Sequence, residues 1–261
     1  MRQPGSHKGE NGTVAVIGGC RHQHGAPLFS ALAAEASGVD LAYVFVPVFH
    51  EEVAKSASFN FQVRTFGSAK SDEISAADRT AMIEFLATID VAVIGPGLAR
   101  TPSGIRSVMQ LLEAAPCTVV ADASALQADT MKYLFGRHAV VTPHLGELER
   151  MGIRKEDLPA VAAKHACTIL QKSQIDTIIG SDGSMRTVEG GNAGLTVGGT
   201  GDALAGLTAG LIAQGMDHTE ACVLASTTIK GAGDLLAKEV GNLYTTREVI
   251  GKIPMLLKGR I

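Results

Sequence analysis

Tryptophan is absent from this chain of 261 residues, and aromatic residues make up only 4% of it. So few aromatic side chains leave little material for stacking the bases of single-stranded nucleic acid. The formal net charge is −3, and no block of basic residues is present, which argues against a non-specific surface for nucleic acid or membrane. We therefore expect neither a nucleic-acid partner nor a membrane partner.

Signals of membrane, secreted and zinc-binding proteins are also missing. No apolar run approaches the about 20 residues that a membrane helix needs, and the polar first residues lack the apolar core of a signal peptide. No C-x-x-C pair is present, so a zinc site is not expected. We interpret the cysteines as buried free thiols and expect a soluble, cytoplasmic protein. They are Cys20, Cys117, Cys167 and Cys222.

Two common catalytic motifs are absent as well. Without a G-x-S-x-G elbow, the chain gives no support to a Ser-His-Asp triad. Because no G-x-G-x-x-G follows the first predicted strand, a Rossmann dehydrogenase is disfavoured. His22 and His24 lie on a predicted loop with no carboxylate nearby in the sequence, so they are a poor zinc pair.

Short buried strands alternate with helices along most of the chain. Such non-alternating apolar strands predict a mostly parallel sheet with helices on both faces. No linker or repeat interrupts the pattern, so residues 1–261 are predicted to form a single α/β domain. Strands are expected at Thr13–Ile17, Leu41–Val46, Phe61–Phe66, Val91–Ile94, Thr118–Ala121, Ala139–Val141 and Thr168–Leu170, and a hairpin at Thr177–Ile179 and Met185–Val188.

Helices fill most of the remaining sequence. Proline is tolerated in a first helical turn, so the first helix is predicted to open at Pro27. The predicted helices are Pro27–Ser37, Glu51–Ala57, Ser75–Thr88, Pro102–Ala114, a helix after Asp122 that reaches Phe135, Ala160–Ala166, Asp202–Gln214, Thr219–Val240 and Arg247–Leu257.

The stretch Thr196–Gly210, TVGGTGDALAGLTAG, is the strongest functional signal. Gly198, Gly199 and Gly201 let a ligand approach the backbone closely. A helix that begins at about Gly201 aims unpaired N–H groups at this loop and favours a bound phosphate. Asp202 beside such an anion suits a base that takes a proton from an attacking hydroxyl. The alternative is an ordinary residue of a first helical turn.

Other polar or glycine-rich positions directly follow predicted strands. These are Gly18-Gly19, Gly95-Pro96-Gly97, Asp122, His144 and Lys172. Ligands bind beyond the carboxyl ends of strands in parallel sheets, so these residues are expected to meet at one site. Each also has a simpler explanation: His144 could cap a turn, Lys172 could be a solvated lysine, and Asp122 is interpreted as a helix cap rather than a magnesium ligand.

Taken in order, the motifs resemble those of one enzyme family. They are IGPGL at Ile94–Leu98, TPHLGE at Thr142–Glu147, GNAGL at Gly191–Leu195 and GGTGDALAG at Gly198–Gly206. The chain is similar to the ADP-dependent NAD(P)H-hydrate dehydratases, which are repair enzymes of the ribokinase-like superfamily. This resemblance implies a ribokinase-like three-layer α/β/α sandwich. It also implies that ADP phosphorylates the hydroxyl of a hydrated nicotinamide ring and that phosphate then leaves.

The resemblance also implies roles for individual residues. Asp202 is the expected catalytic base. The expected substrate-binding residues are Ala26, Gly97, His144, Asn192 and Asp202, and the expected nucleotide-binding residues are Lys172, Ser173, Gln174, Ile175, Asp176, Gly198, Gly199, Thr200 and Gly201.

Cofactors and partners follow from the same resemblance. ADP (or ATP) is the expected phosphoryl donor, with Mg²⁺ held by phosphates and water and with Glu147 as a possible partner of that water. A homo-oligomer, a tetramer or larger, is expected, and no epimerase domain is expected in these residues. Two alternatives stay open: a related kinase acting on a thiazole or hydroxymethylpyrimidine alcohol, and a non-catalytic nucleotide-binding relative.

Overall fold

The computed structural model describes residues 5–134, 136–137 and 139–261. Within them, nine strands form one sheet in the order β3-β2-β1-β4-β5-β6-β7-β8-β9. The strands are β1 (Thr13–Ile17), β2 (Leu41–Pro47), β3 (Phe61–Phe66), β4 (Val91–Ile94), β5 (Thr118–Ala121), β6 (Val140–Val141), β7 (Thr168–Gln171), β8 (Asp176–Ile179) and β9 (Met185–Val188).

The sheet is parallel from β3 to β7, and β8 and β9 pair antiparallel at one edge. Along the chain, β2 and β3 are added in turn on one side of β1, and β4 is then added on the other side of β1. The carboxyl ends of β1 and β4 therefore form the crevice where strand order reverses, the usual ligand position in such sheets. The predicted mostly parallel sheet is confirmed.

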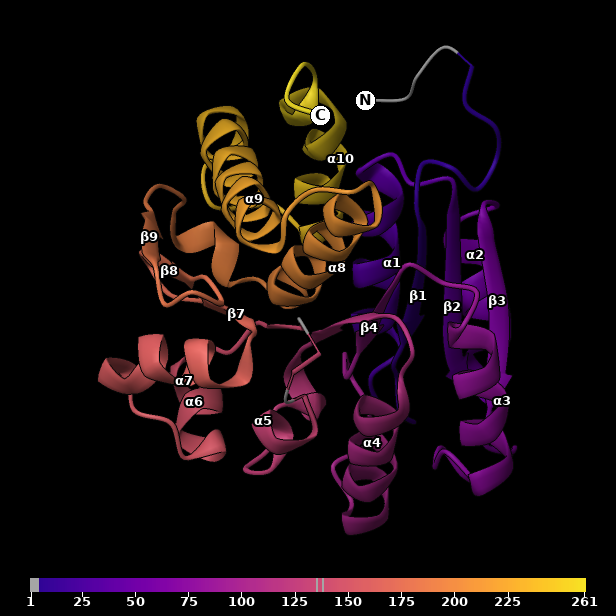
Figure 1. The fold of residues 1–261 in the computed structure, drawn as a ribbon. Helices are drawn as coiled ribbons and strands as arrows, with labels where there is room; N and C mark the ends of the chain where they lie inside the picture. Colours follow the sequence, from indigo (N-terminus) through magenta and orange to yellow (C-terminus); the bar gives the residue numbers. More distant parts are fainter. Residues whose placement is uncertain (1–4, 135, 138) are drawn as a thin grey trace.

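Helices cover both faces of this sheet (Figure 1). Successive side chains of β1 point to opposite faces: Val14 and Val16 pack in one core, and Ala15 and Ile17 in the other. Helices α1, α2, α8, α9 and α10 contribute to the first core, and α3 to α7 contribute to the second, which gives the predicted α/β/α sandwich. The helices are α1 (Gly25–Ala36), α2 (Glu51–Ala57), α3 (Ala76–Leu86), α4 (Pro102–Ala114), α5 (Thr130–Tyr133), α6 (Leu145–Met151), α7 (Leu158–His165), α8 (Thr200–Ala213), α9 (His218–Val240) and α10 (Thr246–Leu257).

Helices α1 and α8 approach each other closely because α8 carries glycines where they meet. A Cβ atom on Gly206 would lie 1.9 Å from the carbonyl oxygen of Ser30, and one on Gly210 would lie 2.2 Å from Ser37 Oγ. The hydroxyl of Ser30 donates a hydrogen bond to the carbonyl of Asp202 at 2.9 Å. The start of α8 is thus held against α1.

The structure corrects several local predictions. No continuous helix follows Asp122: a 3₁₀ turn at Ala123–Ala125 is separated from the four-residue α5, and the predicted end at Phe135 lies outside the described residues. Helix α6 was not predicted. Helix α1 begins at Gly25, so Pro27 still lies in its first turn.

The cysteines match their predicted burial only in part. All four are free thiols; Cys167 and Cys222 are buried, whereas Cys20 and Cys117 are half-buried. Burial raises the pKa of the Cys167 thiol to about 12. In the part of the chain that the structure describes, no helix combines the length and the apolar character needed to cross a bilayer.

The close contact of α1 with α8 predicts a cost for any side chain at Gly206. We expect Gly206→Ala to lower the free energy of unfolding by about 1–3 kcal/mol, because the new methyl group forces the two backbones apart. Gly251→Ala is the matched control, since a Cβ there meets nothing within 4 Å; it should stabilise α10 by about 0.5–1 kcal/mol. Urea denaturation of both variants tests this, and equal stability of the two would contradict it.

Candidate active site

The first turn of α8 leaves backbone donors free. Gly199 precedes the helix with a φ of 99°, a conformation that disfavours other residues. Among the described residues, the N–H groups of Gly201 and Asp202 have no hydrogen-bond acceptor. A Cβ on Gly198 would meet nothing within 4 Å, so the loop is open on its outer side. These donors and the helix dipole make a site for an anion.

A lysine and two carboxylates lie beside this helix end. Lys172 Nζ is 2.7 Å from Asp122 Oδ1 and 3.6 Å from Glu147 Oε2, and both carboxylates are buried. The hydroxyl of Thr142 donates a further bond of 2.7 Å to Asp122 Oδ1. A Cβ on Gly201 would lie 3.4 Å from Lys172 Nζ. The ammonium group of Lys172 is therefore next to the free N–H groups of α8.

This crowding of charge changes the acidity of Asp202. Its burial, followed by repulsion from Asp122, raises the pKa of Asp202 to about 7, although Lys172 lowers it. Burial alone would lower the pKa of Lys172, but attraction to Asp122 and Glu147 more than offsets it, and the pKa of Lys172 is raised. A carboxyl with a pKa near 7 is suited to accept a proton at neutral pH.

Hydrogen bonds show what His144 and Asp122 do within the fold. His144 caps α6: its Nδ1 accepts from the N–H of Glu147 at 3.3 Å, and Glu147 Oε2 accepts from the N–H of His144 at 2.9 Å. The His144 ring is nevertheless exposed. The prediction that the Asp122 side chain caps a helix was wrong, because its carboxylate makes no cap bond and pairs with Lys172 instead.

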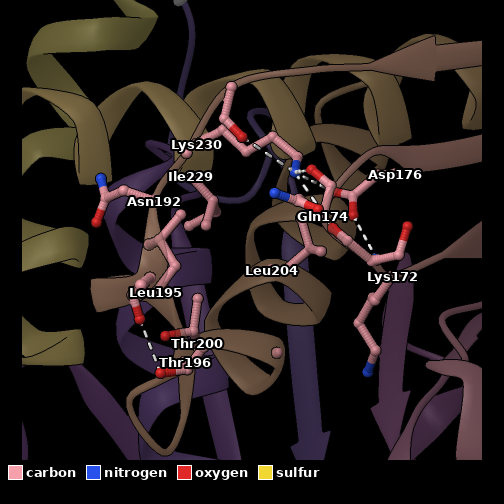
Figure 2. Close-up of a pocket in the computed structure, with 15 residues that line it drawn as sticks. Lys172, Gln174, Asp176, Asn192, Leu195, Thr196, Thr200, Leu204, Ile229 and Lys230 are labelled. Atoms are coloured by element: carbon pink, nitrogen blue, oxygen red, sulfur yellow. Dashed lines mark hydrogen bonds and ion pairs between the residues drawn. The ribbon is translucent and has the colours of Figure 1, made fainter.

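A cavity of about 480 Å³ adjoins Lys172 and the start of α8 (Figure 2). Leu195, Leu204 and Ile229 give it an apolar wall, which is suited to a planar base. Many of the predicted nucleotide residues line it, whereas Ile175, Gly198 and Gly199 lie outside its lining, and Ile175 is 46% exposed. The predicted residues in the lining are Lys172, Ser173, Gln174, Asp176, Thr200 and Gly201, together with Asn192.

The predicted substrate residues fall into two places. A Cβ on Gly97 would lie 3.1 Å from Ala26 Cβ and 2.9 Å from the carbonyl of Gln23, so Gly97 and Ala26 are neighbours at the crevice between β1 and β4. Asn192 instead lines the cavity, where its Oδ1 accepts a bond of 2.6 Å from the hydroxyl of Tyr244. Asn192 therefore lies apart from Gly97 and Ala26, and its predicted role in substrate binding stays a prediction.

Some residues of the site were missed by the sequence analysis. Lys230 of α9 lines the cavity, and Asp234 Oδ2 accepts a bond of 3.1 Å from the N–H of Gly191. Thr246 of α10 donates to the carbonyl of Gly198 at 2.8 Å. Lys230 and Asp234 are four apart on a helix whose neighbouring positions are buried, and such charged residues are a usable signal of a polar contact.

The carboxylates do not form a cage for a metal ion. No set of three His, Cys, Asp or Glu side chains within the described ranges could hold one, and Lys172 lies between Asp122 and Glu147. Mg²⁺ that reaches this site would be carried by nucleotide phosphates and water, as is common for this ion. The prediction that Glu147 assists that water stays a prediction.

The raised pKa of Asp202 predicts a pH-dependent penalty on stability. The unfolded chain releases the proton near the ordinary value of 3.8, and the folded chain releases it near 7. Stability therefore falls as the pH rises through this window. We expect Asp202→Asn to be more stable than the wild type at pH 8 by on the order of 2 kcal/mol, and the difference to vanish toward pH 4.

Thermal denaturation across this pH range measures the effect. Asp129→Asn, the same change at an exposed residue whose side chain makes no cap bond, is the control and should track the wild type. Equal melting temperatures of Asp202→Asn and wild type at pH 8 would contradict the raised pKa.

Comparison with known proteins shows to which family this chain belongs. A family described as NAD(P)H-hydrate dehydratase matches residues 14–255. The chain is 33% identical to the ADP-dependent (S)-NAD(P)H-hydrate dehydratase of Cenarchaeum symbiosum over 98% of this chain and 92% of that protein. It is 34% identical to the bifunctional NAD(P)H-hydrate repair enzyme Nnr of Methanothermobacter thermautotrophicus over 98% of this chain. This chain spans about half of that bifunctional relative, 51% of its length.

Solved structures share the fold. The ADP/ATP-dependent NAD(P)H-hydrate dehydratase of Bacillus subtilis, co-crystallised with ATP and Mg²⁺, superposes with a TM-score of 0.83 at 24% identity. The match covers 99% of this chain and 93% of that one. The ribokinase-like fold is thereby confirmed. On the family match and the identity to its curated members, the chain belongs to the NAD(P)H-hydrate dehydratase family.

Proposed function

We propose that this chain catalyses the ADP-dependent dehydration of hydrated NADH and NADPH. One observation carries the proposal: Asp202, with a pKa raised to about 7, lies on the first turn of α8 beside backbone donors that have no acceptor among the described residues. A base next to an anion site is what transfer of a phosphoryl group to a hydroxyl requires.

In the first stage the nucleotide lies in the cavity with its base against Leu204 and Ile229. Its terminal phosphoryl group docks on the N–H groups at the start of α8, and Lys172 offsets the negative charge. Asp202 takes the proton of the ring hydroxyl, and the hydroxyl oxygen attacks phosphorus. The bond between the terminal phosphorus and the bridging oxygen of ADP breaks, and AMP is the leaving group.

In the second stage the phosphorylated ring loses phosphate. The C–O bond breaks and its electron pair leaves with phosphate, while the lone pair of the ring nitrogen stabilises the cation that forms. Loss of a proton from the neighbouring carbon then restores the double bond of NADH or NADPH. Phosphorylation is useful because phosphate is a far better leaving group than hydroxide.

We also propose roles for the other predicted site residues, a location for the protein and an oligomeric state. Ala26, Gly97 and His144 are proposed to contact the hydrated dinucleotide, and the cavity is proposed to hold the nucleotide, with Mg²⁺ bound to its phosphates. A cytoplasmic location is proposed because the four cysteines are free thiols. A homo-oligomer is proposed because Leu243 and Met255 are 90% and 58% exposed.

Loss of the base should abolish most turnover. We expect Asp202→Asn to lower kcat by about 10²–10⁴, because the hydroxyl must then lose its proton unaided. The assay follows recovery of absorbance at 340 nm from hydrated NADH with ADP and Mg²⁺. Calorimetry should still detect bound ADP. Wild-type activity in this variant would remove Asp202 from the mechanism.

The same assay separates the alternatives. If hydrated NADH is not restored by the wild type, a panel of small alcohols with ATP, scored for a stable phosphorylated product, identifies a kinase. Binding of ADP without turnover of any of these compounds identifies a non-catalytic relative.

The charge of Asp122 should shift the pH dependence of turnover. For the wild type we expect kcat/KM to fall about tenfold per pH unit below pH 6, since Asp202 becomes protonated. Asp122 raises the pKa of Asp202, so in Asp122→Asn this fall of kcat/KM should begin at a pH lower by up to about one unit. Asp129→Asn, the same change at an exposed position, should leave this fall at the same pH as in the wild type. A pH dependence of kcat/KM in Asp122→Asn equal to that of the wild type would contradict the electrostatic coupling between Asp122 and Asp202.

A further inference from the structure

Lys230 is a buried lysine that bonds mainly to backbone carbonyl groups. Its side chain is 9% exposed, and its Nζ donates to the carbonyl of Gln174 at 2.8 Å. Longer bonds reach the carbonyls of Ser173 at 3.3 Å and Gly190 at 3.4 Å, and Asp176 Oδ2 lies 3.7 Å away. Burial of an ammonium group is costly unless such partners surround it.

These partners belong to two separate loops that line the cavity. Ser173 and Gln174 follow β7, and Gly190 follows β9. Figure 2 shows Lys230 reaching from α9 toward Gln174 and Asp176 at the edge of the cavity. The contact of Nζ with both loops fixes the distance between two walls of the cavity.

Neighbours of Lys230 on α9 act on the same loops. The hydroxyl of Ser226 donates to Asp176 Oδ2 at 2.6 Å, and Asp234 Oδ2 accepts from the N–H of Gly191 at 3.1 Å. Ser226, Lys230 and Asp234 are spaced by four, so they lie along one side of the helix. Ser226 fixes the first loop through Asp176, Asp234 fixes the second, and Lys230 joins the two.

A centre enclosed by carbonyl oxygens and one carboxylate is the kind of environment in which proteins hold a monovalent cation. We propose that Lys230 is the positioning residue of the nucleotide cavity, with its ammonium group standing in place of a monovalent cation that would otherwise join the two loops. The lysine is a compact charge with three donors on a flexible stem, which matches three carbonyl partners. Nucleotide binding by this chain is then independent of added K⁺.

The proposal rests on the proposed use of the cavity by an adenine nucleotide, so binding and turnover are measured separately. Binding of ADP to the full chain is measured by titration calorimetry, and turnover by the absorbance assay. If wild-type protein binds ADP but restores no NADH, the dehydratase proposal fails and the role of Lys230 is still tested by the calorimetry. If the wild type does not bind ADP, the role of Lys230 is overturned as well.

Lys230→Met is the main variant because it keeps the length of the stem and removes only the ammonium group. We expect the Kd for ADP to rise about tenfold or more, because three carbonyl bonds to the two loops are lost. The KM for ADP should rise in parallel while kcat at saturating ADP stays within about threefold of the wild type. Lys238→Met, which removes the same charge from an exposed position of the same helix, should leave both constants unchanged. An unchanged Kd in Lys230→Met would overturn the proposal.

Rescue by small cations distinguishes positioning from a general loss of stability. In Lys230→Ala, K⁺ or methylammonium should fill the vacated centre and restore most of the lost ADP affinity, while tetramethylammonium should be too large to enter. A loss of affinity that none of these cations reverses would overturn the proposal.

The wild type gives a test that does not depend on a variant folding. Its Kd for ADP should be the same in K⁺, Na⁺ and choline buffers of equal ionic strength. A severalfold tighter Kd in K⁺ alone would show that the loops still need a free cation, and it would overturn the proposal.

Discussion

The balance of charge around Lys172 Nζ is the interaction on which the site depends. One ammonium group faces Asp122 at 2.7 Å and Glu147 at 3.6 Å, and it also lowers the pKa of Asp202. Without it, buried carboxylates would repel one another across the end of α8, at a cost of several kcal/mol per uncompensated charge. With it, Asp122 and Glu147 are paired, and Asp202 is left as the carboxyl that can exchange a proton near pH 7.

The fold delivers these groups to one place through the ends of successive parallel strands. Asp122 follows β5, Thr142 follows β6, and Lys172 follows β7. Neighbouring parallel strands end at the same edge of the sheet, so residues far apart in sequence become neighbours without any long loop. Helix α8 completes the arrangement from one face, because its glycines allow it to pack against α1 and bring Asp202 to that edge.

The sequence predicted this arrangement well where a residue acts through the backbone or through its position on a strand. The strands, the glycine loop before Asp202 and the edge with Lys172 follow from patterns of apolar residues and glycine. It predicted poorly what depends on a partner distant in sequence. Asp122 looked like a helix cap because its pairing with Lys172, 50 residues away, cannot be read from neighbouring residues.

The same limit explains why the sequence did not predict the positions of Lys230 and Asn192. Lys230 lies within a predicted helix, and only the packing of α9 against β8 and β9 brings it to two loops of the cavity. For Asn192, the family resemblance implied a place near the substrate, together with Gly97 and Ala26. Its bond with Tyr244, 52 residues away, holds it at the wall of the cavity instead.

The antiparallel strands at the edge of the sheet have a topological consequence. β8 reverses the direction of β7, and β9 reverses it again, so the chain leaves Val188 at the same end of the sheet where it left Gln171. An even number of reversals is required for this return. Loss of one of these short strands, or gain of a third, would deliver Gly190 and the whole run to Thr200 to the opposite end of the sheet, away from Lys172. Strand number on this side is therefore constrained by parity rather than by stability alone.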